Sequence, residues 1–500
     1  MPDNQTPNDP PLGPDGKPDY GAIATPEHPL FHHDPGFRKR RGRNWFLLGL
    51  TYAGYYLCRY NLGIIAPELK EELNLSNTQY GAIDSARNGM YAIGQFINGL
   101  FTDKLGGKRA MTIGAVGTAI LNALFGLATM TDIGIIFALL VVIRGLDGYA
   151  QAFGAPGMVK INTAWFRKQE RGSFAGIFGI MINLGQMAAG QLGGLLAKGF
   201  AIPLIFFTFK VESMNWRVMF FIPAVVVVVI VILMNLGVKN HPEEAGFRVV
   251  HDDESHDDDP HAHHVLSDVF RTITKNPIVW IVAGAYFCTG FIRTAIYSWW
   301  TIYLLETWNV GKEAKLWWWT AVVLLPLMAS FGSLSSGIYS DKFCKGSRAP
   351  VAAFLYLMQL VFIILAMLMV GSSSMGSAML AVILILGIHT GCNATHSILG
   401  TAAAMDLGGR KMAGFAAGVI DSFQYFGAML AGFGLGRLFD IFAIAQLDDA
   451  GEPLLNDAGE AVKHIDGAIW FASMLPWAIL GTLLMSYLWV AHRGKSTPGT

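Results

Sequence analysis

The chain has 500 residues, of which 53% are hydrophobic and only 14% are charged, and its basic and acidic side chains balance to a formal net charge of +0. This composition excludes an ordinary soluble globular protein, because apolar runs long enough to cross a bilayer core recur along the chain. We therefore expect a multi-pass protein of the lipid bilayer, without a nucleic-acid partner.

The N-terminal segment is polar. Residues 1 to 36 are rich in Pro, Asp and Gly, and the basic cluster "FRKRRGR" follows them. Such a segment cannot bury enough apolar surface to fold, so we expect a disordered cytoplasmic tail over residues 1–43. A polar tail of this length before the first apolar run also argues against a cleavable signal peptide.

Twelve apolar segments follow the tail. Their lengths predict membrane-spanning helices over 45–66, 79–102, 110–130, 133–157, 173–197, 217–238, 277–304, 316–340, 349–371, 376–400, 412–438 and 467–490. We expect an all-α membrane protein with two six-helix halves, at 44–238 and 276–491, and a cytoplasmic tail at 492–500.

A hydrophilic stretch at 239–275 separates the two halves. It contains "HDDESHDDDPHAHH", which offers imidazole and carboxylate groups for a metal but has neither Cys nor fixed helical spacing. A metal site and a solvated acidic tether both fit this pattern. We interpret the stretch as a cytoplasmic linker and expect no metal site.

Lys and Arg predict the orientation. They gather in alternate loops, at 38–43, 104–109, 167–171, 342–348, 410–411 and 493, whereas the intervening "TMTD" and "GSSSMGS" have none. Lys198, Lys210 and Arg217 weaken the pattern without reversing it. Since cytoplasmic loops are enriched in Lys and Arg, we expect both termini in the cytoplasm. We also expect a location in a cell membrane, of the bacterial inner-membrane type.

The two halves repeat each other. "GLFTD" and "GIYSD" place Asp103 and Asp341 at the ends of the second and eighth helices, and Arg59 and Arg293 interrupt the first and seventh. This spacing predicts halves related by a pseudo-twofold axis along the membrane normal, with a substrate site between them near the midplane. Asp103 and Asp341 are gating candidates, because each can pair with basic residues of the adjacent loop.

Arg59 and Arg293 are the main candidates for binding. A charge at the bilayer centre costs about 2.5–3.5 kcal/mol on insertion scales, so it usually faces a cavity or a partner. Each arginine can form a cross-helix salt bridge, or the two can face each other as an anion site, for which the planar guanidinium is suited. Tyr52 and Tyr56 share one helix face with Arg59 and can donate to the same anion.

Other intramembrane charges have local partners. Asp84 and Arg87 are three residues apart, as are Arg144 and Asp147, and each pair can meet on one helix face. Asp84 and Arg87 are also candidates for coupling or gating. Asp421 is a candidate for proton coupling, and a hydrogen-bonded helix contact explains it equally well.

Several segments resemble the organophosphate:phosphate antiporters of the major facilitator superfamily, across nearly the whole chain from Trp45. "GYYLCRYN" resembles the first helix of that family and "FIRTAIYSWWTIYL" the seventh. The resemblance implies the major facilitator fold, with Tyr52, Tyr56, Arg59 and Arg293 at the phosphate site. It also places Gln151 of "GYAQAFGAP" and Tyr425 of "FQYFG" at site positions.

The fifth helix departs from the family pattern. Asn183 and Gly185 are kept, so Asn183 remains a site candidate, but the family's histidine is replaced by Ile182 and its final glycine by Gln186. A family lysine of the second helix aligns with Gln95. The resemblance therefore implies intact phosphate capture and an altered site for the organic group.

The resulting expectation is a secondary transporter, not an enzyme, because no nucleotide loop, metal constellation or nucleophile elbow is present. It would exchange a sugar-phosphate or glycerol-phosphate type of organophosphate for inorganic phosphate, as a monomer without a cofactor. A phosphate-ester sensor of the same fold and a proton-coupled carrier of another organic anion remain open as alternatives.

Overall fold

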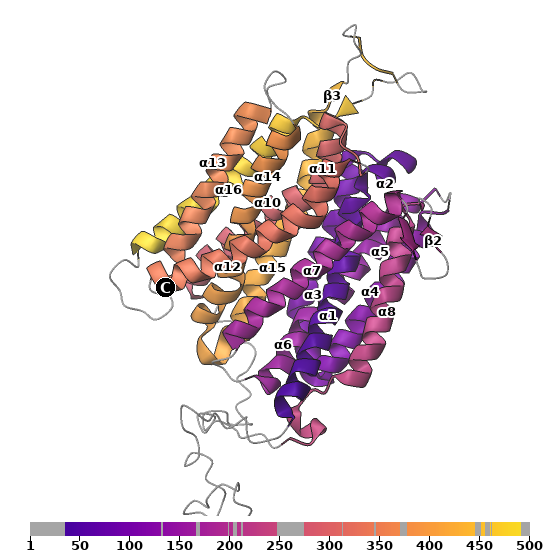
Figure 1. Ribbon diagram of the computed structural model, residues 1–500. Coiled ribbons are helices and arrows are strands. Elements are labelled where there is room, and N and C mark those ends of the chain that lie inside the picture. The colour runs from indigo at the N-terminus through magenta and orange to yellow at the C-terminus, as the bar shows by residue number, and fades with distance from the viewer. Residues whose placement is uncertain are drawn as a thin grey trace, which may run out of the picture.

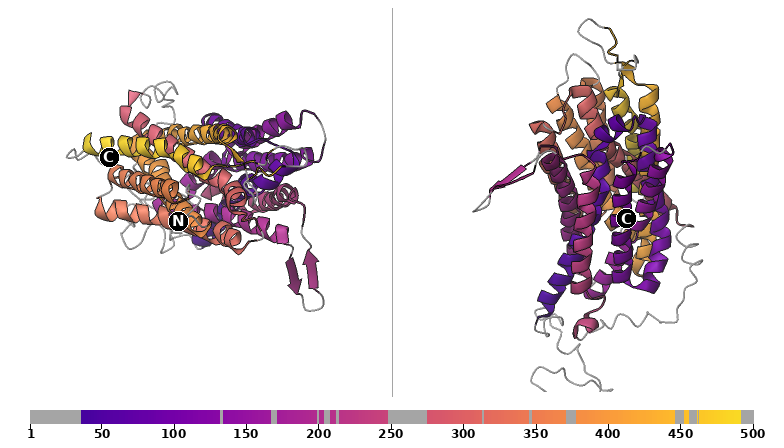
Figure 2. Two further views of the ribbon diagram at one scale, coloured as in Figure 1. Left: turned by 90° about the horizontal axis from the view of Figure 1, so that it is seen from above. Right: turned by 90° about the vertical axis from the view of Figure 1, so that its right-hand side faces the viewer.

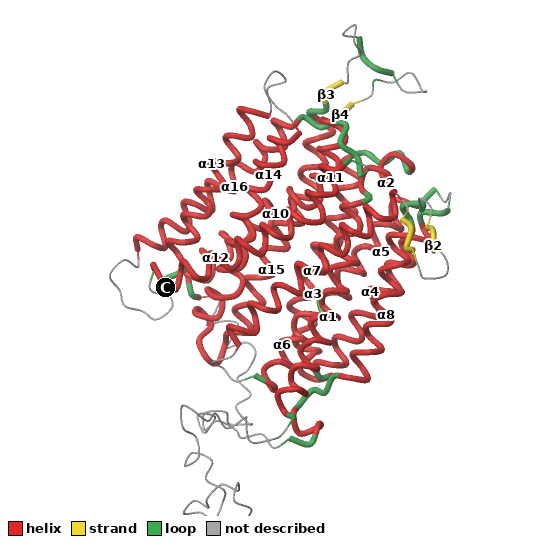
Figure 3. Tube along the Cα trace, viewed as in Figure 1, coloured by secondary structure: helices red, strands yellow, loops and turns green. Residues whose placement is uncertain are grey.

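The computed structural model describes residues 36–131, 134–166, 171–198, 200–203, 208–211, 214–247, 275–312, 314–344, 347–370, 378–445, 452–455, 461 and 463–491. Long helices dominate this part of the chain (Figure 3). Residues 1–35 of the N-terminal tail expected at 1–43, the C-terminal tail expected at 492–500 and most of the linker expected at 239–275 lie outside it.

Helices occur at all twelve expected positions. In the first half they are α1 (Phe37–Ile64), α2 (Ala66–Glu72), α3 (Asn77–Leu105), α4 (Gly107–Ala128), α5 (Ile136–Gln151), α6 (Gly154–Trp165), α7 (Arg171–Lys198), α8 (Val218–Gly237) and the short η3 (Pro242–Ala245). In the second half they are α10 (Pro277–Trp308), α11 (Lys315–Trp318), η5 (Trp319–Leu324), α12 (Leu325–Phe343), α13 (Ala349–Val370), α14 (Ala378–Ser397), η6 (Ile398–Ala403), α15 (Ala404–Ile441) and α16 (Gly467–Ala491).

Within the described residues, eight helices are long and apolar enough to cross a membrane by length and composition. α1, α3, α7 and α15 are also long enough to cross a membrane. These four carry Arg59, Asp84, Gln186 and Asp421. These four helices therefore bring polar side chains into the interior of the bundle.

Two short antiparallel hairpins were not expected. β1 (Phe200–Pro203) pairs with β2 (Thr208–Val211), and β3 (Ile444–Ala445) pairs with β4 (Lys463–His464). Both lie at the same end of the bundle as α2, and β1–β2 projects away from the helices (Figures 1 and 2). We refer to this end as the α2 end.

The first helix begins at Phe37, so residues 37–43 of the expected N-terminal tail are helical. The basic cluster is anchored, because Arg40 Nη2 donates to the Gly237 carbonyl at 2.9 Å and the Arg41 guanidinium lies 4.8 Å from the Phe166 ring centre. A cation at the C-terminal end of α8 is also favoured by the helix dipole.

The two halves lie side by side in Figure 1, with α3 of the first half packed along α15 of the second. The approach is close because a Cβ atom at Gly81 would overlap the Gly432 carbonyl oxygen. Asp440 adds a polar contact, accepting hydrogen bonds from the backbone N–H groups of Asn77 (3.0 Å) and Thr78 (2.8 Å) at the start of α3. Small residues that allow helix backbones to approach are typical of membrane interfaces.

Gly81→Ala should destabilise the protein by about 1–3 kcal/mol, because the added methyl group meets backbone that cannot rotate away. The measurement is the thermal unfolding midpoint in detergent, which should fall. Gly99→Ala on the same helix is the control, since a Cβ atom there meets nothing within 4 Å. Equal midpoints for both variants would contradict the close α3–α15 contact.

Two ion pairs join the halves at the α2 end. Lys70 Nζ on α2 lies 2.9 Å from Glu306 Oε1 on α10, and Lys312 Nζ lies 2.5 Å from Glu68 Oε1. Glu306 also accepts from the backbone N–H of Ile465 at 2.9 Å, which ties the segment before α16 to the same point. These ion pairs therefore bind α2 to the second half at this end.

Another acidic residue of α2, Glu72, contacts residues of its own half. It accepts from Trp216 Nε1 at 2.6 Å and pairs with Arg217 Nη2 at 2.7 Å. The hydrogen bond from Arg217, with that from Trp216, lowers the pKa of the Glu72 carboxyl group below its ordinary value. Glu72 therefore fixes α2 to the segment that precedes α8.

Candidate functional site

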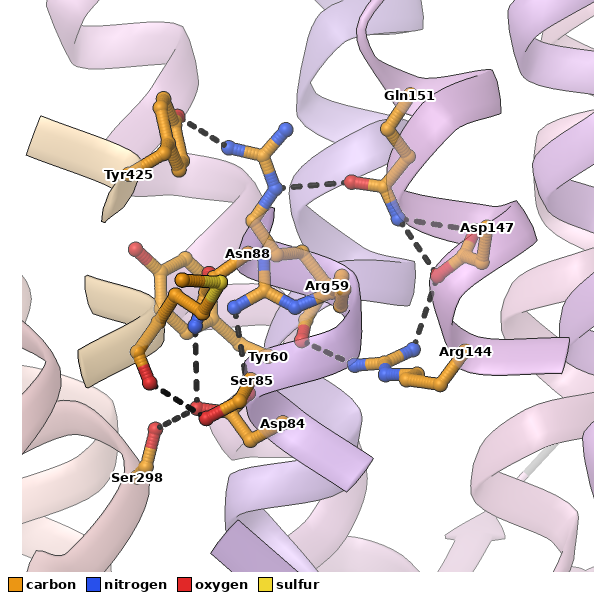
Figure 4. Close-up of polar contacts among 12 residues, drawn as sticks. Arg59, Tyr60, Asp84, Ser85, Asn88, Arg144, Asp147, Gln151, Ser298 and Tyr425 are labelled. Carbon is orange, nitrogen blue, oxygen red and sulfur yellow. Dashed lines mark hydrogen bonds and ion pairs between the residues drawn. The ribbon is translucent and has the colours of Figure 1, made fainter. Parts of the chain in front are cut away.

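Arg59 lies at the centre of the helix bundle with only 5% of its surface exposed. Its Nε donates to Gln151 Oε1 at 2.8 Å and its Nη1 donates to the Tyr425 hydroxyl at 3.2 Å (Figure 4). The rings of Tyr56 and Tyr91 each lie 4.6 Å from its guanidinium carbon. Nη2 is buried without a hydrogen-bond partner, so one corner of the guanidinium is available to a ligand.

Residues of α5 fix the Gln151 amide and the backbone of Arg59 in place. Gln151 Nε2 donates to both oxygens of Asp147, at 3.1 and 3.0 Å, and Arg144 Nη1 lies 3.0 Å from Asp147 Oδ2. Arg144 Nη2 also donates to the backbone carbonyl of Arg59 at 3.0 Å. Because an ionised carboxylate only accepts, Asp147 turns the amide so that its oxygen faces Arg59.

Arg293 occupies the corresponding place in the second half and is 8% exposed. Its Nη2 donates to the Tyr60 hydroxyl at 3.2 Å, and its guanidinium carbon lies 5.2 Å from the Tyr297 ring centre. Its Nε is buried without a partner. The Tyr60 ring lies 5.6 Å from that of Tyr56 and 4.9 Å from that of Tyr297, so tyrosines line the interior between the two arginines.

Among the described residues, neither Arg59 nor Arg293 forms an ion pair with a carboxylate. Asp84 instead pairs with Arg87 at 3.3 Å, and Asp147 pairs with Arg144, as their spacing predicted. Both buried guanidiniums are hydrogen-bonded by neutral groups, and the Asp421 carboxyl group of α15 interacts with both of them only at longer range. This arrangement favours the anion-site interpretation over the cross-helix salt bridge.

Asp84 also connects the halves. Ser298 Oγ of α10 donates to Asp84 Oδ2 at 2.8 Å, and Asn88 Nδ2 donates to the same oxygen at 3.3 Å (Figure 4). The Tyr80 hydroxyl donates to the Ser298 carbonyl at 2.9 Å. This hydrogen-bonded junction of α3 and α10 can form only while the halves are close at this level.

The model of the Major Facilitator Superfamily matches residues 48–432, which is most of the chain. The chain belongs to the Major Facilitator Superfamily. A crystal structure of a bacterial homologue of the human lysosomal transporter Spinster has the same fold, with a TM-score of 0.68 and 16% identity over 91% of this chain and 97% of that one.

Three curated relatives of this facilitator are named for phosphate esters or for sensing. A probable hexose phosphate transport protein of Chlamydia pneumoniae is 26% identical over 83% of this chain and 90% of its own length. The glycerol-3-phosphate transporter of Bacillus subtilis is 27% identical (79% and 85%). The membrane sensor protein UhpC of Escherichia coli is 26% identical (81% and 88%). The resemblance seen in the sequence is confirmed, and the facilitator is a transporter-type protein rather than an enzyme.

The remaining site candidates of this facilitator lie at different distances from the arginines. Tyr52 is buried on α1 with its ring 5.5 Å from that of Tyr56. Asn183 Nδ2 donates to Ser330 Oγ of α12 at 2.6 Å rather than to a group at either guanidinium. Asp421 is partly buried on α15, one helical turn before Tyr425. The side chains of Asp103 and Asp341 lie outside the described ones.

Sequence reasoning missed several residues that the fold brings to the facilitator's arginines. Tyr297 lies four residues after Arg293 on the same helix face, and this spacing was a usable signal. Tyr60 and Tyr91 gave no such signal, because each contacts an arginine of a different helix. Tyr60 of α1 contacts Arg293 of α10, and Tyr91 of α3 contacts Arg59 of α1. Only the packing of α1 and α3 in three dimensions places them here.

Proposed function

We propose that the protein exchanges an organophosphate, of the sugar-phosphate or glycerol-phosphate type, for inorganic phosphate by alternating access of its two halves. Arg59 and Arg293 bind the phosphate group between the halves. The observation that carries this proposal is the pair of buried guanidiniums of Arg59 and Arg293. Within the part of the chain that the structure describes, neither forms an ion pair with a carboxylate, and Arg59 Nη2 and Arg293 Nε are buried without a hydrogen-bond partner. Guanidinium groups bind phosphate oxygens in a bidentate manner and stay charged at physiological pH.

The surrounding groups support an anion as the ligand. Tyr56 and Tyr52 extend along α1 from Arg59, and Gln151 and Tyr425 fix its guanidinium from two other helices. A phosphate bound to both arginines would draw the halves together, because one arginine comes from each. Its release then follows when the halves separate at the opposite side.

The contacts at the α2 end suggest which side is closed. The ion pairs of α2 with the second half, and the Ser298–Asp84 hydrogen bond, lie between the arginines and this end. We place the α2 end outside the cell, with both termini and the linker 239–275 in the cytoplasm of a bacterial-type cell. Opening to the outside requires these contacts to break, with Asp84 and Arg87 changing partners. Asp103 and Asp341 would act at the cytoplasmic gate.

The test is phosphate counterflow. Purified protein is reconstituted as a monomer into liposomes loaded with unlabelled phosphate, and uptake of labelled phosphate is measured. We expect rapid uptake that requires internal phosphate and is competed by phosphate esters. Uptake that depends on a pH gradient and not on internal phosphate would contradict antiport, and would indicate a proton-coupled carrier that uses Asp421.

A phosphate-ester sensor of the same fold is the second candidate, supported by the similarity to the membrane sensor protein UhpC. A sensor can keep both arginines, so the site alone does not separate the two functions. The liposome experiment does: ligand-dependent thermal stabilisation together with negligible counterflow would favour the sensor, whereas efficient exchange favours the transporter.

A further inference from the structure

A second polar cluster lies beside Arg293 and is built from both halves. It consists of Gln186 on α7, Tyr297 on α10, and His389 and Asn393 on α14, all of them buried. The Tyr297 hydroxyl lies 3.3 Å from Gln186 Oε1 and 3.3 Å from His389 Nε2. We call these four residues the Gln186 cluster. None of its side chains is an acid or a strong base.

The hydrogen bonds of the cluster orient the amide of Gln186 through Tyr297. His389 Nε2 lies 3.1 Å from the Leu325 carbonyl, which can only accept, so this nitrogen carries the proton. Asn393 Nδ2 lies 3.3 Å from the other ring nitrogen and 3.2 Å from Nε2, and it donates to the His389 backbone carbonyl at 2.9 Å. Nε2–H also faces the Tyr297 oxygen, and the Tyr297 hydroxyl proton points to Gln186 Oε1. The chain of donors therefore ends at Gln186 and fixes the orientation of its amide.

This orientation presents the amide nitrogen of Gln186 as a donor. Among the described residues that nitrogen has no hydrogen-bond partner, whereas Asn183, three residues earlier on α7, already donates to Ser330 of α12. Of these two amides of α7, that of Gln186 is therefore the one available to a ligand.

The cluster continues directly from the phosphate site. The Tyr297 ring lies 5.2 Å from the Arg293 guanidinium carbon and 4.9 Å from the Tyr60 ring centre. A phosphate held by Arg293 therefore places whatever is esterified to it within reach of Tyr297 and the residues beyond. Arg59 has different neighbours, Gln151 and Tyr425, which are occupied by its own hydrogen bonds.

Resting on the proposed phosphate site, we infer that the Gln186 cluster binds the organic part of the substrate and selects a neutral, hydroxyl-bearing group. Gln186 donates to a substrate hydroxyl oxygen, and Tyr297 and His389 hold that amide in place. The substrate class is then a sugar or polyol phosphate rather than a carboxylated phosphate ester.

A carboxylated ester is disfavoured because its extra charge would lack a partner. Burying an ionised carboxylate without a cation is costly. Arg87 and Arg144 are paired with Asp84 and Asp147, while Arg59 and Arg293 are assigned to the phosphate. A hydroxyl group requires only the neutral hydrogen bond that Gln186 supplies.

The test is competition against labelled phosphate exchange in proteoliposomes, with glucose 6-phosphate, glycerol 3-phosphate and 3-phosphoglycerate as competitors. We call glucose 6-phosphate and glycerol 3-phosphate the neutral esters, because their organic groups carry no charge. For the wild type, these two should compete at concentrations about tenfold or more below that of 3-phosphoglycerate, since an uncompensated carboxylate charge costs more than one hydrogen bond. Gln186→Leu should weaken competition by the neutral esters about tenfold, and leave the half-saturating concentration of phosphate unchanged. Gln186→Lys should improve competition by 3-phosphoglycerate relative to the neutral esters.

Thr390→Val is the matched control, because Thr390 neighbours His389 but its hydroxyl donates to its own helix at Leu386 (2.7 Å). This variant should behave as the wild type. Equal competition by 3-phosphoglycerate and the neutral esters, or equal weakening of phosphate and esters by Gln186→Leu, would overturn the inference while leaving phosphate exchange intact. If the wild type does not exchange phosphate, the proposed transport fails instead, and thermal stabilisation of the detergent-solubilised protein by the same three esters tests the selectivity.

Discussion

Arg59→Lys and Arg293→Lys are each expected to weaken phosphate binding about 100-fold, although both keep the positive charge. A hydrogen bond to a charged group contributes about 1.5–3 kcal/mol, and an ammonium cannot reproduce the planar fork that meets two phosphate oxygens. At Arg59 the loss is compounded, because Nε and Nη1 are held by Gln151 and Tyr425 while Nη2 points free. Lysine has one nitrogen and cannot satisfy these partners and a ligand together.

The measurement is the half-saturating phosphate concentration in counterflow, with the thermal unfolding midpoint recorded for each variant to show that it is folded. Arg437→Lys, at an exposed position of α15, is the matched control and should exchange phosphate normally. Near-normal phosphate affinity in either of the two site variants would remove that arginine from the proposed site.

The arginines were predictable from the sequence for a physical reason. A charge inside an apolar run is costly, and the repeat of that feature at Arg59 and Arg293 pointed to a site shared by two halves. The pairing of Asp84 with Arg87 was also predictable, because it depends only on the spacing of residues along one helix.

The contacts across helices were not predictable in the same way. Gln186 appeared only as a departure from a family pattern, and His389 gave no signal, because their meeting at Tyr297 depends on how α7, α10 and α14 rotate against one another. The early start of α1 at Phe37 was missed because the anchors of its basic residues lie far along the chain, at Gly237 and Phe166. Local pattern identifies a costly residue, whereas the residues that hold it come from packing.

The pair formed by Arg144 and Asp147 is expected to have the largest effect on stability. Their side chains are 2% and 1% exposed, so Asp147→Leu leaves a guanidinium buried without its counter-ion. Removing one partner of a buried pair costs about 3–5 kcal/mol, so this variant should unfold at a much lower temperature in detergent. The double variant Arg144→Met with Asp147→Leu removes both charges, and its unfolding temperature should return close to that of the wild type, since apolar replacement of a whole buried pair is often neutral.

Phosphate affinity separates a structural role of Asp147 from a positioning role. In the stable double variant Gln151 has lost the carboxylate that orients its amide, so Arg59 is less well held and phosphate affinity should stay reduced by about tenfold, the value of one hydrogen bond. Gln151→Leu alone should give the same loss, and combining it with the double variant should add nothing further, because both changes remove the same contact. If the double variant recovers both stability and phosphate affinity, Asp147 only neutralises Arg144, and the orientation of Gln151 has no part in binding.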